Sequence, residues 1–451
     1  MSTSPDLPPG PRLPNAIQSA NMWIRPHRWL RRMHARYGNV FSVNVAPIGR
    51  AVYLADPADI KTVFAGDPAT YRAGEANSLL RGLLGDTSVL LVDQAEHRTR
   101  RKQMLPPFHR EAVARQVDQM AEIADAEVAR WPVGREFAAA PSMAAITLEV
   151  IMRIVIGADD PARLAALRRV LPGVVDMGYL GLLSMMYPNL LRYPPWYRVR
   201  RRRAEMDRLL FAEITDRRAD PNLADRTDVL SMLVRAADDD GATMSDTQLR
   251  DQLATLLFAG HETTATGLTW ALERLTRHPG ALRRAVAAAD SGDDEYLDAV
   301  VKETLRIRPV VHEVGRVLHE PVELGGYRIP AGTMVAPGIG LVHASDAVYP
   351  DAEGFDPDRM LPGSGTKITP TTWLPFGGGT RRCLGATFAQ VEMRVVLREI
   401  LRRVELETTE SPGERQRVKH VTLTPHQGGR VRVRARRPAS LPREEATRSG
   451  S

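Results

Sequence analysis

Hydrophobic and polar positions repeat with a helical period over most of this 451-residue chain. The clearest patterns predict four helices, and a glycine directly after the first of them predicts its end. These segments are Pro26–Tyr37, Leu253–Leu275, Tyr296–Arg308 and Leu384–Leu401. The region 110–235 has the same period except near Met177–Trp196, an apolar stretch rich in Leu, Met, Tyr and Pro. The pattern therefore predicts a mainly helical chain.

Alternating positions predict strands near both ends of the chain. Val40–Val45 and Ala51–Leu54 are expected to pair around a short turn, and Val418–Val433 to form a last hairpin. The tip of that hairpin is expected at Pro425–Gly428, directed toward a pocket. Arg72–Leu91 contains glycines and few periodic positions, which predicts a mobile loop over the pocket.

The amino-acid composition limits the classes to which this protein can belong. Length alone would suggest about three domains, and 43% hydrophobic residues suffice for a core of this size. A single cysteine excludes a disulfide within the chain and fits a reducing compartment such as the cytoplasm. No segment reaches the roughly 20 apolar residues that span a bilayer, and the polar start lacks the pattern of a signal peptide. The net charge of +7 would suit nucleic acid, but no zinc-finger or aromatic RNA-binding motif occurs.

The only cysteine, Cys383, lies in an unusual run from Phe376 to Gly385, just before a predicted helix. A lone cysteine is more often a small buried hydrophobe than a ligand. Here three glycines at 377–379 would let the backbone approach a flat ligand, and Arg381 and Arg382 add positive charge. Cations and a helix N-terminus favour the thiolate, so Cys383 is expected to be ionised and to bind a metal. Thiolate ligation is one way in which proteins hold haem iron.

The helix Leu253–Leu275 contains an acid beside a hydroxyl, in the run Ala259-Gly-His-Glu-Thr-Thr264. Such a pair is an odd choice for packing, and a pair of this kind can deliver protons to a bound oxygen species. A structural alternative stays open. Thr263 could bond back to a carbonyl one turn earlier while Glu262 reaches solvent.

Two further helical pairs carry charge. Glu303 and Arg306 are three residues apart and lie on one helix face, where they could form an ordinary exposed ion pair. His97 and Arg101 lie one turn apart and could grip one anionic group together. This second pair could equally belong to a solvated basic face.

Together these motifs resemble the cytochromes P-450, the haem-thiolate monooxygenases. Phe376, Gly379, Cys383, Gly385 and Ala389 match the haem-ligand loop of that family, and the other three motifs occur in the family's order. The resemblance implies a mainly α fold with a smaller β-rich lobe (α+β), a triangular prism with haem between distal and proximal helices. It also implies one domain over 1–451, with a proline-containing arm at 1–20 and a disordered tail at 437–451.

The resemblance assigns a role to each matched residue. Cys383 would be the axial ligand of heme b (iron protoporphyrin IX), within a loop that includes Phe376 and Gly385. Thr263 and Glu262 would supply protons to oxygen beside Ala259 on the distal helix. The haem propionates would be held by four cations, His97, Arg101, Arg316 and Arg381. Glu303 and Arg306 would join Arg359, of the run Phe355-Asp-Pro-Asp-Arg359, in a structural triad that braces the ligand loop.

The implied function is insertion of one oxygen atom from O2 into a hydrophobic small molecule, such as a fatty acid, terpenoid, steroid or polyketide-like compound. Electrons would come from NAD(P)H through a ferredoxin and its reductase. The resemblance also implies a soluble monomer of a bacterial, actinobacterial type. This monomer would have no transmembrane anchor and no nucleic-acid partner. The alternatives are a peroxide-driven or non-oxygenating enzyme of the same fold, and a haem-binding sensor or carrier. Pocket walls are expected from the segments 79–91, 180–191, 256–259, 310–314 and 425–427, with 177–196 as the lid.

Overall fold

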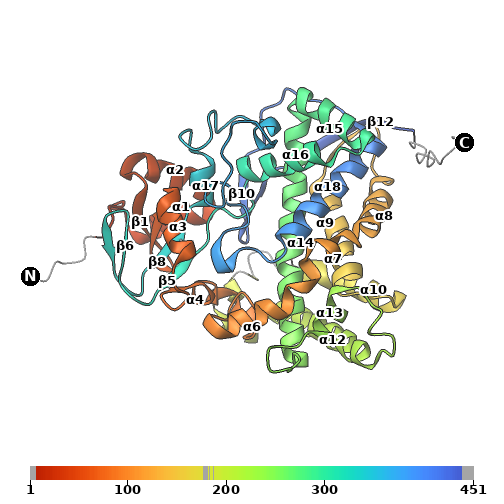
Figure 1. Ribbon diagram of the computed structural model, residues 1–451, viewed down its shortest axis with the longest axis horizontal. Helices are drawn as coiled ribbons and strands as arrows, with labels where there is room; N and C mark the ends of the chain where they lie inside the picture. The colour runs from red at the N-terminus through yellow and green to blue at the C-terminus, as the bar shows by residue number, and fades with distance from the viewer. Residues whose placement is uncertain (1–6, 176–180, 182, 186, 439–451) are drawn as a thin grey trace, which may run out of the picture.

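The computed structural model describes residues 7–175, 181, 183–185 and 187–438. Helices dominate, and most strands of the N-terminal half lie at one end of the molecule, whereas the last strand lies near the other end (Figure 1). The α-helices are α1 (Asn15–Ile24), α2 (Pro26–Tyr37), α3 (Pro57–Ala65), α4 (Ala73–Ala76), α5 (Arg81–Leu84), α6 (Gln94–Met104), α7 (Arg110–Ala114), α8 (Val117–Val128), α9 (Ala140–Val150), α10 (Pro161–Val175), α12 (Tyr197–Ala219), α13 (Val229–Arg235), α14 (Asp246–Thr276), α15 (Pro279–Ser291), α16 (Asp294–Ile307), α17 (Ile339–His343) and α18 (Ala386–Arg403). The predicted mainly α fold with a smaller β-rich lobe is confirmed.

The β-rich lobe is built on a five-stranded sheet in the order β1-β2-β8-β5-β3. The antiparallel pair β1–β2 agrees with the predicted one, and β2 pairs in parallel with β8. A three-stranded sheet (β4-β12-β9) and two hairpins (β6–β7 and β10–β11) complete the strands. Their bounds are β1 (Val40–Val45), β2 (Gly49–Leu54), β3 (Tyr71–Arg72), β4 (Glu136–Ala138), β5 (Arg316–Leu318), β6 (Val322–Leu324), β7 (Tyr327–Ile329), β8 (Met334–Pro337), β9 (Val404–Leu406), β10 (Gln416–Lys419), β11 (Thr422–Pro425) and β12 (Arg430–Arg436).

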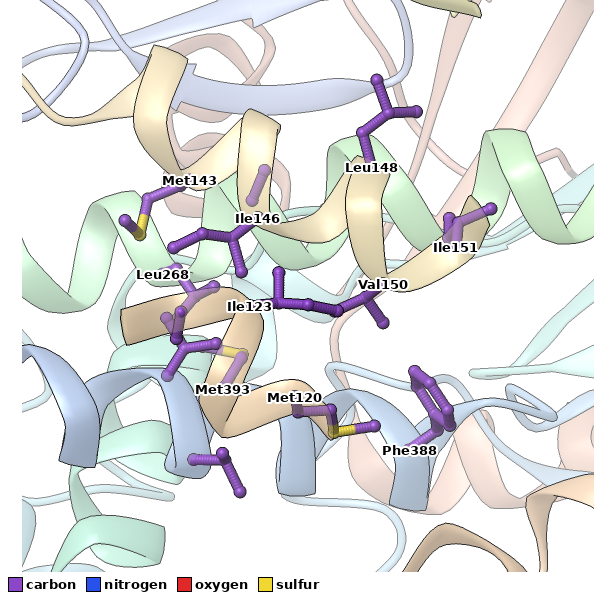
Figure 2. Close-up of a cluster of buried hydrophobic side chains, with 14 of the residues drawn as sticks. Met120, Ile123, Met143, Ile146, Leu148, Val150, Ile151, Leu268, Phe388 and Met393 are labelled. Atoms are coloured by element: carbon purple, nitrogen blue, oxygen red, sulfur yellow. The ribbon is translucent and has the colours of Figure 1, made fainter. Parts of the chain in front are cut away.

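The main core lies where α8, α9, α14 and α18 meet. Figure 2 shows side chains of these four helices packed together, among them Met120, Ile146, Leu268 and Met393. All four are at most 1% exposed, and full burial of an aliphatic side chain of this size contributes about 1.5–3 kcal/mol. This packing fixes α14 and α18, the two helices that carry or adjoin the candidate site.

The long central helix α14 begins earlier than its hydrophobic pattern predicts. A capping box starts it: the Gln248 N–H donates to Ser245 Oγ, and the Ser245 N–H donates to Gln248 Oε1. These bonds satisfy N–H groups that the first helical turn leaves without partners. The polar turns that precede Leu253 therefore belong to the helix as well.

The segment predicted as a mobile loop is tied to α14 instead. The Thr87 N–H and hydroxyl donate to Asp251 Oδ2 at 3.0 and 2.8 Å, and the Val89 N–H donates to Gln252 Oε1 at 2.9 Å. Two short helices, α4 and α5, also lie within this segment. The prediction failed because these bonds join residues more than 160 positions apart, which local glycine content cannot reveal.

The last hairpin also differs from its prediction. β10 and β11 pair in the register Gln416↔Pro425 and Lys419↔Thr422, so the turn is His420-Val421. The predicted tip starts at the last residue of β11 and continues into the connection 426–429 to β12, where Gly428 and Gly429 adopt positive φ. The predicted tip therefore lies five residues beyond the turn that the strand pairing forms. The predicted tail lies almost entirely outside the described residues, as do parts of the N-terminal arm and of the lid. The single-domain organisation stays a prediction.

Candidate active site

Between Asp251 and Thr276, helix α14 is mostly buried, but one of its faces is accessible to solvent. From Asp251 to Thr276, the residues that are not buried are Leu256, Phe258, Ala259, Gly260, Glu262 and Thr263. Positions 256, 259, 260 and 263 have the spacing of a single helical face. A central helix packed on its other sides therefore presents this face to an open space within the fold.

Thr263 uses its hydroxyl within the helix. Its Oγ1 donates to the Ala259 carbonyl oxygen at 2.5 Å, which is the back-bonding arrangement that the sequence left open. The oxygen keeps its acceptor capacity toward the open face, because a hydroxyl has two lone pairs and one hydrogen. Thr263 can therefore accept a hydrogen bond there, and can donate one only after turning away from Ala259.

Glu262 points to the β10–β11 turn. The Glu262 carboxylate lies 3.1 Å from His420 Nδ1, 3.3 Å from Thr422 Oγ1 and 3.6 Å from Lys419 Nζ. The side chains of Glu262 and His420 are 14% and 17% exposed. Sequence reasoning missed these partners, because it placed the tip of the hairpin five residues later.

The cysteine loop depends on its glycines. Gly377 and Gly379 adopt positive φ angles of 63° and 65°. A Cβ added at Gly378 or Gly379 would lie within about 2.2 Å of Phe64 atoms, so side chains there would collide with α3. The Cys383 N–H donates to the Phe376 carbonyl oxygen at 2.9 Å, which closes the loop just before α18. The Phe376 ring packs edge-on against Trp373.

The Cys383 side chain is exposed, yet it lies deep enough that burial raises the pKa of its thiol. The Gly385 N–H, Arg382 and Arg101 lower that pKa and offset the effect only in part. In the protein alone, burial therefore opposes the expected ionisation of Cys383. The helix end and the arginines do not outweigh the loss of water around the sulfur. A bound metal ion deprotonates a coordinating thiol directly.

The four residues predicted as cations lie together, and three of them are arginines. Burial, then Arg381, Arg101 and Arg316, lower the pKa of His97 to about 3. Burial and Arg381 lower the pKa of Arg316 to about 10. Within the described part of the chain, the carboxylate beside them is that of Asp93, which pairs with Arg381. The cluster thus has more positive charge than its neighbours neutralise.

This excess suits a ligand with two carboxylates. Buried cations are favourable only when anions accompany them, and Arg101 also lies close enough to Cys383 for the two to interact. A cysteine, three arginines and a histidine that can donate a hydrogen bond fit haem, which offers an iron and two propionates. The thiol and the positive charges of this region therefore match the iron and the carboxylates of haem.

The predicted bracing triad is formed and fully buried. Arg306 Nε and an Nη of the same side chain each donate to Glu303 at 2.7 Å, and Arg359 Nε donates to Glu303 at 3.1 Å. Arg306 also donates to the carbonyl oxygens of His343, Ala352 and Gly354. An exposed helix ion pair is excluded, since the Glu303 and Arg306 side chains are both 0% exposed.

The family profile described as Cytochrome P450 matches residues 5–432. This chain belongs to the cytochrome P450 family. It is 62% identical over 456 residues to cytochrome P450 135B1 of Mycobacterium tuberculosis, covering 100% of this chain and 96% of that protein. Cytochrome P450 135A1 of the same species is 41% identical, with 95% of each chain covered. These relatives agree with the predicted actinobacterial type.

Solved structures of other cytochromes P450 have the same fold. The retinoic acid-bound cyanobacterial CYP120A1 aligns with a TM-score of 0.82 at 26% identity, covering 95% of this chain and 99% of that chain. The heme domain of cytochrome P450DA also reaches 0.82, at 24% identity, with 97% and 99% covered. Membership makes this P450 an oxidoreductase of the haem-thiolate monooxygenase class, with haem as cofactor. Among the described residues, no helix is long and apolar enough to cross a membrane.

Proposed function

We propose that Cys383 is the axial ligand of heme b, and that His97, Arg101, Arg316 and Arg381 hold its propionates. The observation that carries this proposal is the cluster of three arginines and His97 beside the cysteine loop, in which the carboxylate of Asp93 pairs with Arg381. Phe376, Gly385 and Ala259 would contact the cofactor from the loop and from α14. Haem held by a thiolate binds dioxygen and supplies the oxidising power for inserting one oxygen atom into a substrate.

The chain's own contribution is the supply of protons and the exclusion of water. Thr263 would hold a proton donor in place beside the bound oxygen, since its acceptor capacity faces the open side of α14. Glu262 would take up protons at its carboxylate from the solvent side. No direct bond joins the two described side chains, so water molecules would carry protons between them.

The substrate we propose is a hydrophobic small molecule. A cluster of Leu83, Leu84 and Leu91 has Met185 of the predicted lid and Phe258 of α14 packed against it. Three of the predicted pocket segments contribute side chains to this cluster, which supports an apolar pocket wall, and 310–314 and 425–427 stay predictions. CYP120A1 holds retinoic acid, a terpenoid acid, and this supports a terpenoid among the proposed classes alongside fatty acids, steroids and polyketide-like compounds.

The electron donor we propose is an acidic ferredoxin with its reductase. Arg382 is exposed directly beside Cys383, and the chain carries a net charge of +7. Opposite charges on two surfaces speed their encounter and orient it. The single cysteine favours a reducing compartment, and a cytoplasmic location stays a prediction. The monomeric state also stays a prediction.

Thr263→Ala tests the oxygenase function. Retinoic acid, dodecanoic acid and testosterone are screened for a spin-state shift, and the best binder is turned over with NADPH, ferredoxin and ferredoxin reductase. Product formed per NADPH is expected to fall about tenfold or more, because proton delivery by a positioned group contributes on this scale. Thr215→Ala is the control, since Thr215 makes the same backbone bond, to Phe211, on the exposed side of α12. Unchanged product in Thr263→Ala would favour a peroxide-driven enzyme or a haem carrier.

A further inference from the structure

The β10–β11 turn provides Glu262 with an unusual set of neighbours. His420 and Lys419 approach its carboxylate from the turn, and Thr422 approaches from the start of β11. Thr422 is buried, whereas the side chains of His420 and Lys419 are 17% and 32% exposed. Side chains of the turn, and not of α14, therefore lie between the Glu262 carboxylate and solvent.

The hydrogen bond fixes the form of the histidine ring. An ionised carboxylate only accepts hydrogen bonds, so Nδ1 of His420 carries a hydrogen when it bonds Glu262 Oε2 at 3.1 Å. In the neutral ring Nε2 is then the nitrogen that can accept a proton. The separation lies within the range that direct proton transfer requires.

A purely structural tie would not need this ring. Lys419 already places a positive charge beside the carboxylate, and the Thr422 hydroxyl bonds its other oxygen. Imidazole adds the ability to take a proton at one nitrogen and release one from the other near neutral pH. His420 adopts a positive φ of 54°, a conformation that asparagine adopts as readily, so the turn itself does not require histidine.

We propose that His420 relays protons from solvent to Glu262, as a positioning residue for oxygen activation. Nε2 takes a proton from a hydronium ion of the solvent, which becomes water, while the Nδ1 proton moves to Glu262 Oε2, so that the ring stays neutral and the carboxylate becomes a carboxylic acid. Glu262 then gives this proton to water on the open face of α14. Glu262 is then a carboxylate again, and the ring returns to its first form when a hydronium ion of the solvent protonates Nδ1 and Nε2 gives its proton back to water. This inference rests on the proposed oxygenase function.

The test compares His420→Asn and His420→Gln with the wild type in the coupled assay. Both amides can donate a hydrogen bond to Glu262, but neither can relay a proton. Product per NADPH is expected to fall about tenfold in both variants. The matched control is His319→Gln, because His319 Nε2 also contacts a glutamate, Glu75, at 2.6 Å, but both side chains are about half exposed. It should couple as the wild type does.

Amide hydrogen exchange over residues 416–425 provides a readout that does not depend on turnover. Exchange in the variants should match the wild type, which shows that the turn stays docked on α14. Wild-type coupling in His420→Asn or His420→Gln would overturn the relay alone, and so would lost coupling accompanied by faster exchange in this hairpin. A wild-type protein that forms no product with NADPH and ferredoxin would overturn the proposed function and the relay with it.

Discussion

Arg306→Ala is expected to lower the free energy of unfolding by about 3–5 kcal/mol, the usual cost of removing one partner of a buried ion pair. The substitution leaves Glu303 buried without its main partner and three carbonyl oxygens without a donor. Burial already raises the pKa of Glu303, and Arg306 is the strongest influence that lowers it. Urea unfolding, followed by far-ultraviolet circular dichroism, measures the loss.

Arg284→Ala is the matched control for this variant. Arg284 pairs with Asp358, and both side chains are about half exposed. An exposed pair is worth about 0–1 kcal/mol, so this variant should unfold close to the wild type. Equal losses in Arg284→Ala and Arg306→Ala would contradict a bracing role for the buried triad.

Arg316→Met is expected to speed the loss of haem about 10- to 100-fold. A hydrogen bond to a charged group contributes about 1.5–3 kcal/mol, and methionine fills similar space without the charge. Because burial and Arg381 lower the pKa of Arg316 more than Asp93 raises it, its charge is unfavourable until a propionate accompanies it. The haem-free variant should therefore be no less stable than the haem-free wild type. Haem transfer to apomyoglobin, followed by absorbance, measures the rate.

Two variants control for the loss of the arginine. Arg316→Lys keeps the charge and should hold haem more tightly than Arg316→Met. Arg328→Met removes an arginine from the exposed side of β7 and should release haem at the wild-type rate. Haem release from Arg316→Met at the wild-type rate would contradict the role of Arg316 with the propionates.

The sequence predicted the elements whose signals are local. α2 matches its predicted bounds of Pro26–Tyr37, where a helical period ends at a glycine with positive φ. The triad was foreseen because Glu303 and Arg306 are three residues apart, and resemblance supplied Arg359. The four cations were likewise found one motif at a time, and the fold then placed them around one region.

Long-range contacts and burial were beyond local patterns. The partners of Glu262 lie about 160 residues away, in a turn whose position depends on the pairing of Lys419 with Thr422. The order of the segment near Thr87 depends on Asp251 and Gln252 of α14. The raised pKa of Cys383 follows from its depth in the fold, whereas its neighbours in sequence suggested the opposite direction.

The absorption spectrum of the reduced, CO-bound protein tests the central claim most directly. Thiolate ligation by Cys383 predicts a Soret band shifted strongly to the red in the wild type. Cys383→His should lose this band while the protein stays folded by circular dichroism. A Soret band typical of histidine ligation in the wild type, or a red-shifted band that persists in Cys383→His, would contradict the assignment of Cys383 as the haem ligand.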